Sequence, residues 1–182
     1  MFVKLVNFML GCDKNHFSKI ILLGFLSFFS VTAPAQERLN TSKDSLAVTK
    51  VVFGIASYSR WPQALERLNI CIVGMTQYAD DLQDNTGLEN VDIARIAPAD
   101  TDRLQACHVL YIGQLNLTEK KSLYNKIIGM PILSISEENK LCDDGALICL
   151  RVSDGSAGFQ INTDAVARSG LRIQPRVLKL GR

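Results

Sequence analysis

The chain has 182 residues, with 20 Lys and Arg against 18 Asp and Glu, which gives a formal net charge of +2. This length fits one domain of ordinary size. A charge so close to neutral argues against a nucleic-acid partner, because binding to phosphates needs a clear surplus of basic residues.

Residues 1–35 have the order of a secretory signal peptide. A weakly basic segment that ends at Lys19 precedes the apolar run "IILLGFLSFFSV", and the small-x-small site Ala33-Pro34-Ala35 follows it. The apolar run is shorter than the roughly 20 residues that a transmembrane helix needs. We therefore expect export to the periplasm with cleavage after Ala35. An uncleaved membrane anchor is the alternative.

The remaining segment, residues 36–182, is expected to form a single periplasmic domain. Without residues 1–35 its basic and acidic residues are equal in number, 17 of each. Its end is nevertheless basic, because every charged residue after Asp164 is an arginine or a lysine: Arg168, Arg172, Arg176, Lys179 and Arg182. This segment is either a solvated helix end or a face that binds an anion or a partner.

Four cysteines remain once Cys12 has been removed with the signal peptide: Cys71, Cys107, Cys142 and Cys149. An even number after export indicates two disulfides in an oxidising compartment. Three pairings are possible, and spacing alone does not decide between them. Zinc binding is disfavoured, because there is no C-x-x-C pair and His108 is the only histidine left.

The first predicted element after the signal peptide is a helix. Residues 36–43 are polar and are expected to be frayed, with Thr41 or Ser42 as the helix cap. Apolar residues at 48, 51, 52, 55 and 56 then recur at helical spacing. The helix is expected to end near Arg60, because a proline disfavours helical geometry at the residue before it and Pro62 follows.

Strands and helices are then expected to alternate. The predicted strands are 69–74, 91–96, 108–113 and 131–136, and the segments 146–152 and 158–162 form a predicted hairpin. The predicted helices are a short one at 77–83, one at 118–129 between Thr118 as cap and Gly129 as stop, and short ones at 163–170 and 174–180. This order predicts the α/β class: a single domain with a mostly parallel sheet, an antiparallel edge pair and helices on both faces.

The sequence lacks the residues that catalysis would need. No phosphate-binding loop or dinucleotide-binding glycine motif follows the predicted strands. A Ser–His–Asp or Cys–His site would depend on His108, which opens a predicted buried strand and fits a structural role better. Acidic pairs such as Asp80-Asp81 are expected to be solvated charges. We therefore expect neither an enzyme nor a bound cofactor.

The stretch "YSRWP" carries a different kind of chemistry. Tyr58, Arg60 and Trp61 place two aromatic rings and a guanidinium within four positions, and Trp61 is the only tryptophan of the chain. Arginine with tryptophan is a common composition at protein interfaces, and the pair can also hold a planar ligand by stacking. Alternatively, Trp61 packs the end of the helix onto the sheet. Both interpretations stay open at this point.

Several of these features together resemble the YfiR family of bacterial periplasmic proteins. They are the signal peptide, "VFGIASYSRWP", "LNICIVG", the four cysteines and the closing "GFQINTDAVARSGLRIQPRVLKLGR". The resemblance covers most of the chain after residue 35, although residues 75–105 carry no matching motif.

The resemblance implies a function in cyclic-di-GMP signalling. A protein of this family binds and inhibits the periplasmic sensor region of a YfiN-like inner-membrane diguanylate cyclase, which lowers cyclic-di-GMP and biofilm formation. A YfiB-like outer-membrane lipoprotein sequesters the inhibitor. The family also implies a homodimer and the local disulfides Cys71–Cys107 and Cys142–Cys149.

Six residues of the matching motifs are the candidate binding residues for a partner or ligand: Tyr58, Arg60, Trp61, Asn162, Arg168 and Arg172. The alternative function is a periplasmic sensor that binds a small aromatic or anionic ligand at the aromatic–arginine site.

Export can be tested directly on the protein from the periplasm. We expect its N-terminus to be Gln36, because the apolar run and the small-x-small site direct cleavage after Ala35. Mass spectrometry of the periplasmic fraction measures this. A protein that still begins at Met1 would contradict the prediction.

Overall fold

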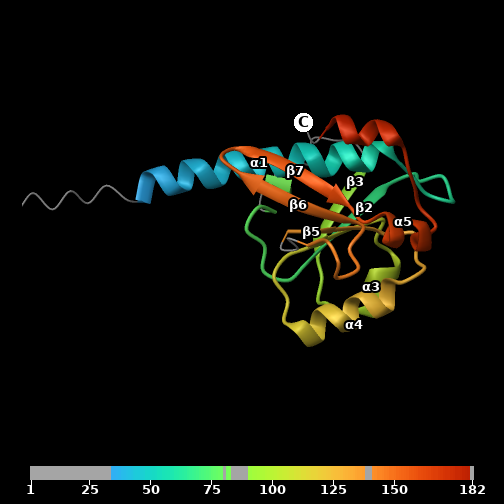
Figure 1. Cartoon of the computed structure of the whole chain (residues 1–182). Coiled ribbons are helices and arrows are strands. Elements are labelled where there is room, and N and C mark those ends of the chain that lie inside the picture. The colour runs from blue at the N-terminus through green and yellow to red at the C-terminus, as the bar shows by residue number, and fades with distance from the viewer. Residues whose placement is uncertain (1–33, 80, 83–89, 138–140, 181–182) are drawn as a thin grey trace, which may run out of the picture. The chain divides into compact units, whose positions relative to one another are not determined.

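The computed structural model describes residues 34–79, 81, 82, 90–137 and 141–180 (Figure 1). Residues 1–33 of the expected signal peptide lie outside this range, and so do residues 80 and 83 of the short helix expected at 77–83. Of that expected helix, residues 81 and 82 are helical and residues 77–79 are not. None of the helices in the described part of the chain is both long enough and apolar enough to cross a membrane.

A six-stranded sheet with the strand order β3-β2-β4-β5-β6-β7 forms the centre of the described chain. Neighbours from β3 through β6 are parallel, and β7 is antiparallel to β6. The strands are β2 Leu68–Val73, β3 Val91–Arg95, β4 Val109–Ile112, β5 Leu133–Ser136, β6 Ile148–Ser153 and β7 Ser156–Ile161. The predicted fold class is confirmed.

The other elements that the structure describes in full are four α-helices, one 3-10 helix and two short strands. The helices are α1 Pro34–Tyr58, α3 Thr101–Gln105, α4 Leu117–Ile127 and α5 Thr163–Ser169, followed by the 3-10 helix η1 Pro175–Lys179. The short strands β1 Ser59–Arg60 and β8 Arg172–Ile173 pair with each other in a separate antiparallel sheet.

Helices cover both faces of the sheet, as expected (Figure 1). Because successive side chains of a strand point to opposite faces, each central strand contributes to two cores. Ile70 and Ile72 of β2 pack with α1 in the larger core, whereas Val73 of β2 packs with Leu104 of α3 and Leu123 of α4. Strands buried in this way on both faces explain the continuous apolar runs of the sequence.

Helix α1 begins earlier than the sequence predicted. It is already helical at Pro34, so neither Thr41 nor Ser42 caps its start. Between Pro34 and Gly54 there is no further proline or glycine, so nothing in this segment stops a helix from continuing towards the N-terminus. The residues that contact the main core begin with Val48.

The start of α4 also corrects the sequence interpretation. Its N-cap is Asn116 and not Thr118. The side chain of Asn116 accepts a hydrogen bond from the backbone N–H of Glu119 at 2.9 Å, and the Glu119 carboxylate accepts one from the backbone N–H of Asn116 at 3.1 Å. This is a capping box, which satisfies two N–H groups that the helix itself leaves unpaired.

The predicted hairpin joins β6 to β7 through a two-residue turn. Asp154 and Gly155 have φ angles of 50° and 77°, which is the left-handed geometry of a type I′ turn. The N–H of Gly155 donates a hydrogen bond to the carboxylate of Asp44 at 2.6 Å, which ties the turn to α1.

The carboxyl edge of the central strands is closed by backbone contacts. After β2 and β4, Met75 and Gln114 exchange hydrogen bonds through N···O distances of 3.2 and 2.6 Å. The carboxylate of Glu137, which follows β5, accepts hydrogen bonds from the N–H of Tyr78 at 3.0 Å and from the hydroxyl of Tyr111 at 2.6 Å. β2 and β4 flank the point where the strand order reverses, and open α/β sheets commonly bind ligands outside the carboxyl ends there. In this protein, backbone pairs occupy that position.

Gly113 makes the closure of this edge testable. A Cβ atom at Gly113 would overlap the carbonyl group of Met75 and lie 2.8 Å from Cγ2 of Thr76. We expect Gly113→Ala to lower the free energy of unfolding by about 3 kcal/mol through overpacking. Urea denaturation measures this.

Gly158→Ala is the matched control, because the nearest atom to a Cβ at that position is the carbonyl oxygen of Arg151 at 3.9 Å. Equal stability of the two variants would contradict the close approach of the segments that follow β2 and β4.

Candidate functional site

The "YSRWP" stretch lies where α1 ends and the chain turns towards β2. The hydroxyl of Ser59 donates to the carbonyl of Ile55 at 2.9 Å, and the N–H of Gln174 donates to the carbonyl of Tyr58 at 2.9 Å. Pro62 then prevents the helix from resuming. These bonds hold β1 against β8 and fix the direction in which each following side chain points.

The β1–β8 pair places two arginines directly opposite each other. Arg60 is the cross-strand partner of Arg172, and both side chains are exposed. Facing residues of an antiparallel pair lie side by side, and like charges at such positions are destabilising. The fold therefore brings together two arginines that the sequence separates by more than a hundred residues.

Acidic side chains do not compensate this arginine pair within the described part of the chain. The guanidinium of Arg60 donates to the carbonyls of Ser57 at 3.0 Å and of Ser59 at 2.8 Å, at the C-terminal end of α1. Neither Arg60 nor Arg172 forms an ion pair with a described residue. The pair is thus a positive surface that is open to an acidic group from outside.

Trp61 occupies a different place from its neighbour Arg60. Its ring is partly buried, packs against the main core and makes an edge contact with His108, with ring centroids 6.2 Å apart and an interplanar angle of 74°. Its Nε1 atom is buried and has no hydrogen-bond acceptor among the described residues. Trp61 therefore has a packing role, and it also lines a cavity.

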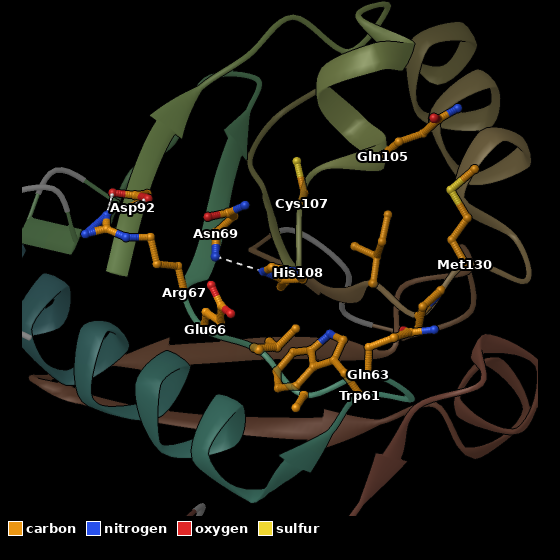
Figure 2. A pocket seen from close by; sticks show the side chains of 14 residues that line it. Trp61, Gln63, Glu66, Arg67, Asn69, Asp92, Gln105, Cys107, His108 and Met130 are labelled. Atoms are coloured by element: carbon orange, nitrogen blue, oxygen red, sulfur yellow. Dashed lines mark hydrogen bonds and ion pairs between the residues drawn. The ribbon is translucent and has the colours of Figure 1, made fainter. Parts of the chain in front are cut away.

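That cavity has a volume of about 730 Å³ and lies at the amino-terminal edge of the sheet (Figure 2). Its lining comes from the segment between β1 and β2, from the starts of β2 and β4, and from the segment before β5. The polar side chains around it include Glu66, Arg67, Asn69, Asp92, Gln105 and His108. Arg67 donates two hydrogen bonds to the Asp92 carboxylate, at 2.7 and 2.9 Å.

His108 is held in one neutral form. Its Nδ1 accepts a hydrogen bond from the backbone N–H of Asn69 at 3.0 Å, so the ring proton of the neutral imidazole lies on Nε2. Burial lowers the pKa of His108 below its ordinary value, because the charged form loses its hydration. The cavity is therefore lined by an uncharged imidazole at neutral pH.

The remaining candidate binding residues do not join this region. Asn162 caps α5: its side-chain oxygen accepts from the N–H of Ala165 at 2.9 Å, and its amide nitrogen donates to the carbonyl of Cys142 at 3.0 Å. Arg168 lies exposed at the end of α5, beside a smaller cavity of about 200 Å³. Of the six candidates, the structure brings together Arg60 and Arg172, with Tyr58 and Trp61 next to them in the chain.

Two disulfides stabilise the segments that border these sites. Cys71 of β2 pairs with Cys107, the residue before His108, and Cys142 pairs with Cys149 of β6. Their Cα atoms are 5.8 and 5.6 Å apart, within the ordinary range for disulfides. This is the local pairing that the resemblance implied. The bond of Cys107 fixes the start of β4 and with it the position of His108.

Sequence reasoning missed most of the cavity. Glu66, Arg67 and Asp92 belong to no motif, and the sequence position of His108 favours a structural role. One signal was present: in a parallel sheet, the segments that precede successive strands meet at one edge. His108 and the residues before strands β2 and β5 could have been grouped on that basis.

Comparison with known proteins gives a family. A family model described as YfiR/HmsC-like matches residues 46–182, and the chain belongs to this family. The family consists of periplasmic, non-catalytic regulators of cyclic-di-GMP signalling. The two disulfides fit the oxidising compartment in which such proteins act.

The pH dependence of stability tests the state of His108. Its pKa is lowered in the folded protein, so the unfolded chain takes up the proton more readily, and the free energy of unfolding falls as the pH drops through about 6.5. We expect this fall to be smaller in His108→Asn, whose side-chain oxygen still accepts from Asn69 but cannot become charged. Urea denaturation of both proteins at pH 7.5 and pH 5.5 measures the difference. An equal fall in both proteins would contradict the prediction.

Proposed function

As this chain is a member of the YfiR/HmsC-like family, we propose that it inhibits an inner-membrane diguanylate cyclase by binding the cyclase's periplasmic region. In this proposal the protein is a periplasmic homodimer, and it lowers cyclic-di-GMP and biofilm formation. A YfiB-like outer-membrane lipoprotein relieves the inhibition by sequestering it.

The observation that carries the proposal is the facing pair Arg60 and Arg172. Two exposed arginines side by side repel each other in the free protein, and an acidic partner removes that cost on binding. Arginine is also enriched where interfaces hold carboxylates, because its planar guanidinium forms two parallel hydrogen bonds with them. We propose that this pair contacts an acidic site on the cyclase.

A second candidate function is supported by the cavity beside Trp61. Its volume of about 730 Å³ lies within the range of small-molecule sites. In that case the protein is a periplasmic sensor whose ligand changes how it acts on the cyclase. One measurement distinguishes the two functions. Without any added ligand, the purified protein lowers the activity of the cyclase only if it inhibits the cyclase directly.

Arg172→Gln separates a binding role from a structural one. Removing one of two facing like charges leaves stability unchanged or slightly raised, whereas losing a contact with an acidic partner weakens repression. We expect an unchanged or higher melting temperature, normal protein abundance and raised cyclic-di-GMP in cells. Arg60→Gln separates the two roles less well, because Arg60 also donates to the backbone carbonyls of Ser57 in α1 and Ser59 in β1.

The matched control is Lys121→Gln, which removes an exposed positive charge from α4 on the other face of the sheet. This variant is expected to repress like wild type. If Arg172→Gln represses as well as Lys121→Gln at equal abundance, the arginine pair does not bind the cyclase.

A further inference from the structure

The cavity beside Trp61 lies at an edge of the sheet where helices end. Trp61 is three residues past the end of α1, Cys107 is two past the end of α3, and Met130 is three past the end of α4. The C-terminal end of a helix carries unpaired carbonyls and a partial negative charge, which favours cations. The carbonyls of Leu104 and Ile127 at the ends of α3 and α4 already accept hydrogen bonds from the N–H groups of Cys107 and Met130. The side chains of the lining therefore decide which ion the cavity favours.

The charged side chains of the lining have a net negative charge. Arg67 and Asp92 neutralise each other through their two hydrogen bonds. Glu66 has no ion pair or hydrogen bond with a described residue, and His108 is neutral. Among the residues that line the cavity, the uncompensated charge is therefore the carboxylate of Glu66, and no unpaired cation is present to hold an anion.

The apolar part of the lining includes an aromatic ring. Trp61 lines the cavity, and because its Nε1 is buried, the accessible atoms of its ring are carbons. Met130, Pro131 and Ile132 add further apolar surface. Figure 2 shows Trp61 and Glu66 both directed towards the same space. Of the aromatic side chains, tryptophan is the one whose ring face attracts cations most strongly.

We propose that this cavity binds a small organic ammonium ion with an apolar body, held over the ring of Trp61 with the carboxylate of Glu66 as its counter-charge. This chemistry differs from that of the arginine pair, which suits acidic groups, and Arg60 does not line the cavity. The proposal rests on the cavity alone and does not depend on inhibition of the cyclase.

The only tryptophan of the chain lies in the proposed site, so its fluorescence reports occupancy directly. The test uses protein purified from cells that express the full chain, with three probes of similar size: benzyltrimethylammonium, benzyl alcohol and benzoate. We expect saturable quenching with benzyltrimethylammonium at millimolar concentrations and at least fivefold weaker binding of the other two. No saturation with the cation, or benzoate binding as tightly, would overturn the proposal.

Substitution of the counter-charge gives the second arm of the test. Glu66→Gln keeps the size of an exposed side chain and removes its charge, so we expect an unchanged melting temperature and benzyltrimethylammonium binding about twofold to fivefold weaker. The control is Asp154→Asn in the turn between β6 and β7, where asparagine also tolerates the positive φ. This variant should bind the cation like wild type. Equal affinity of Glu66→Gln and Asp154→Asn for the cation would contradict the proposed role of Glu66 as its counter-charge.

Discussion

The pairing of β1 with β8 is the contact on which both candidate sites depend. Each strand has only two residues, yet the pair joins the end of α1 to the C-terminal segment of the chain. It buries Ser59, turns Arg60 outward beside Arg172 and leaves Trp61 to enter the cavity. Such a short pair is not stable alone, so the packing of α1 on the sheet must hold it in place. The larger core, to which Val48 and Ile55 contribute, provides that packing.

The cavity lies at the amino edge of the central sheet, whereas α/β folds usually bind ligands at the carboxyl edge. At the carboxyl edge, where ligands are common in α/β folds, the Met75–Gln114 pair and the Glu137 carboxylate fill the position with hydrogen bonds. At the amino edge the cavity is open and is bordered by the C-terminal ends of helices. The C-terminal end of a helix does not present the free N–H groups that bind phosphates at helix N-termini.

The sequence predicted the sheet well because burial on both faces leaves long apolar runs that alternate with helical segments. It predicted less well where structure depends on distant contacts. β1 and β8 are too short to show a pattern, and their pairing exists only in the folded chain. The Asn116 capping box has a sequence signal, because Glu119 follows Asn116 at the required spacing, whereas Thr118 lies inside the helix. The parallel sheet order places the segments before β2, β4 and β5 at one edge, but no sequence pattern shows which of their side chains line a cavity.

The motif around Trp61 illustrates the same limit. Its composition indicated recognition or packing, and in the structure its neighbouring residues have different surroundings. Trp61 packs on the core and lines the cavity, while Arg60 joins Arg172 on the surface. Adjacent residues of a strand point to opposite sides, so a compact sequence motif does not have to form one compact site.

The central claim is that the Arg60–Arg172 pair recognises acidic groups on the cyclase, and the salt dependence of binding tests it most directly. The affinity of the purified protein for the purified periplasmic region of the cyclase should be measured over a range of ionic strength, for wild type and for Arg60→Gln/Arg172→Gln. Electrostatic recognition predicts that wild-type affinity falls as salt rises and that the double variant binds weakly with little salt dependence. Equal affinity and equal salt dependence in the two proteins would contradict it.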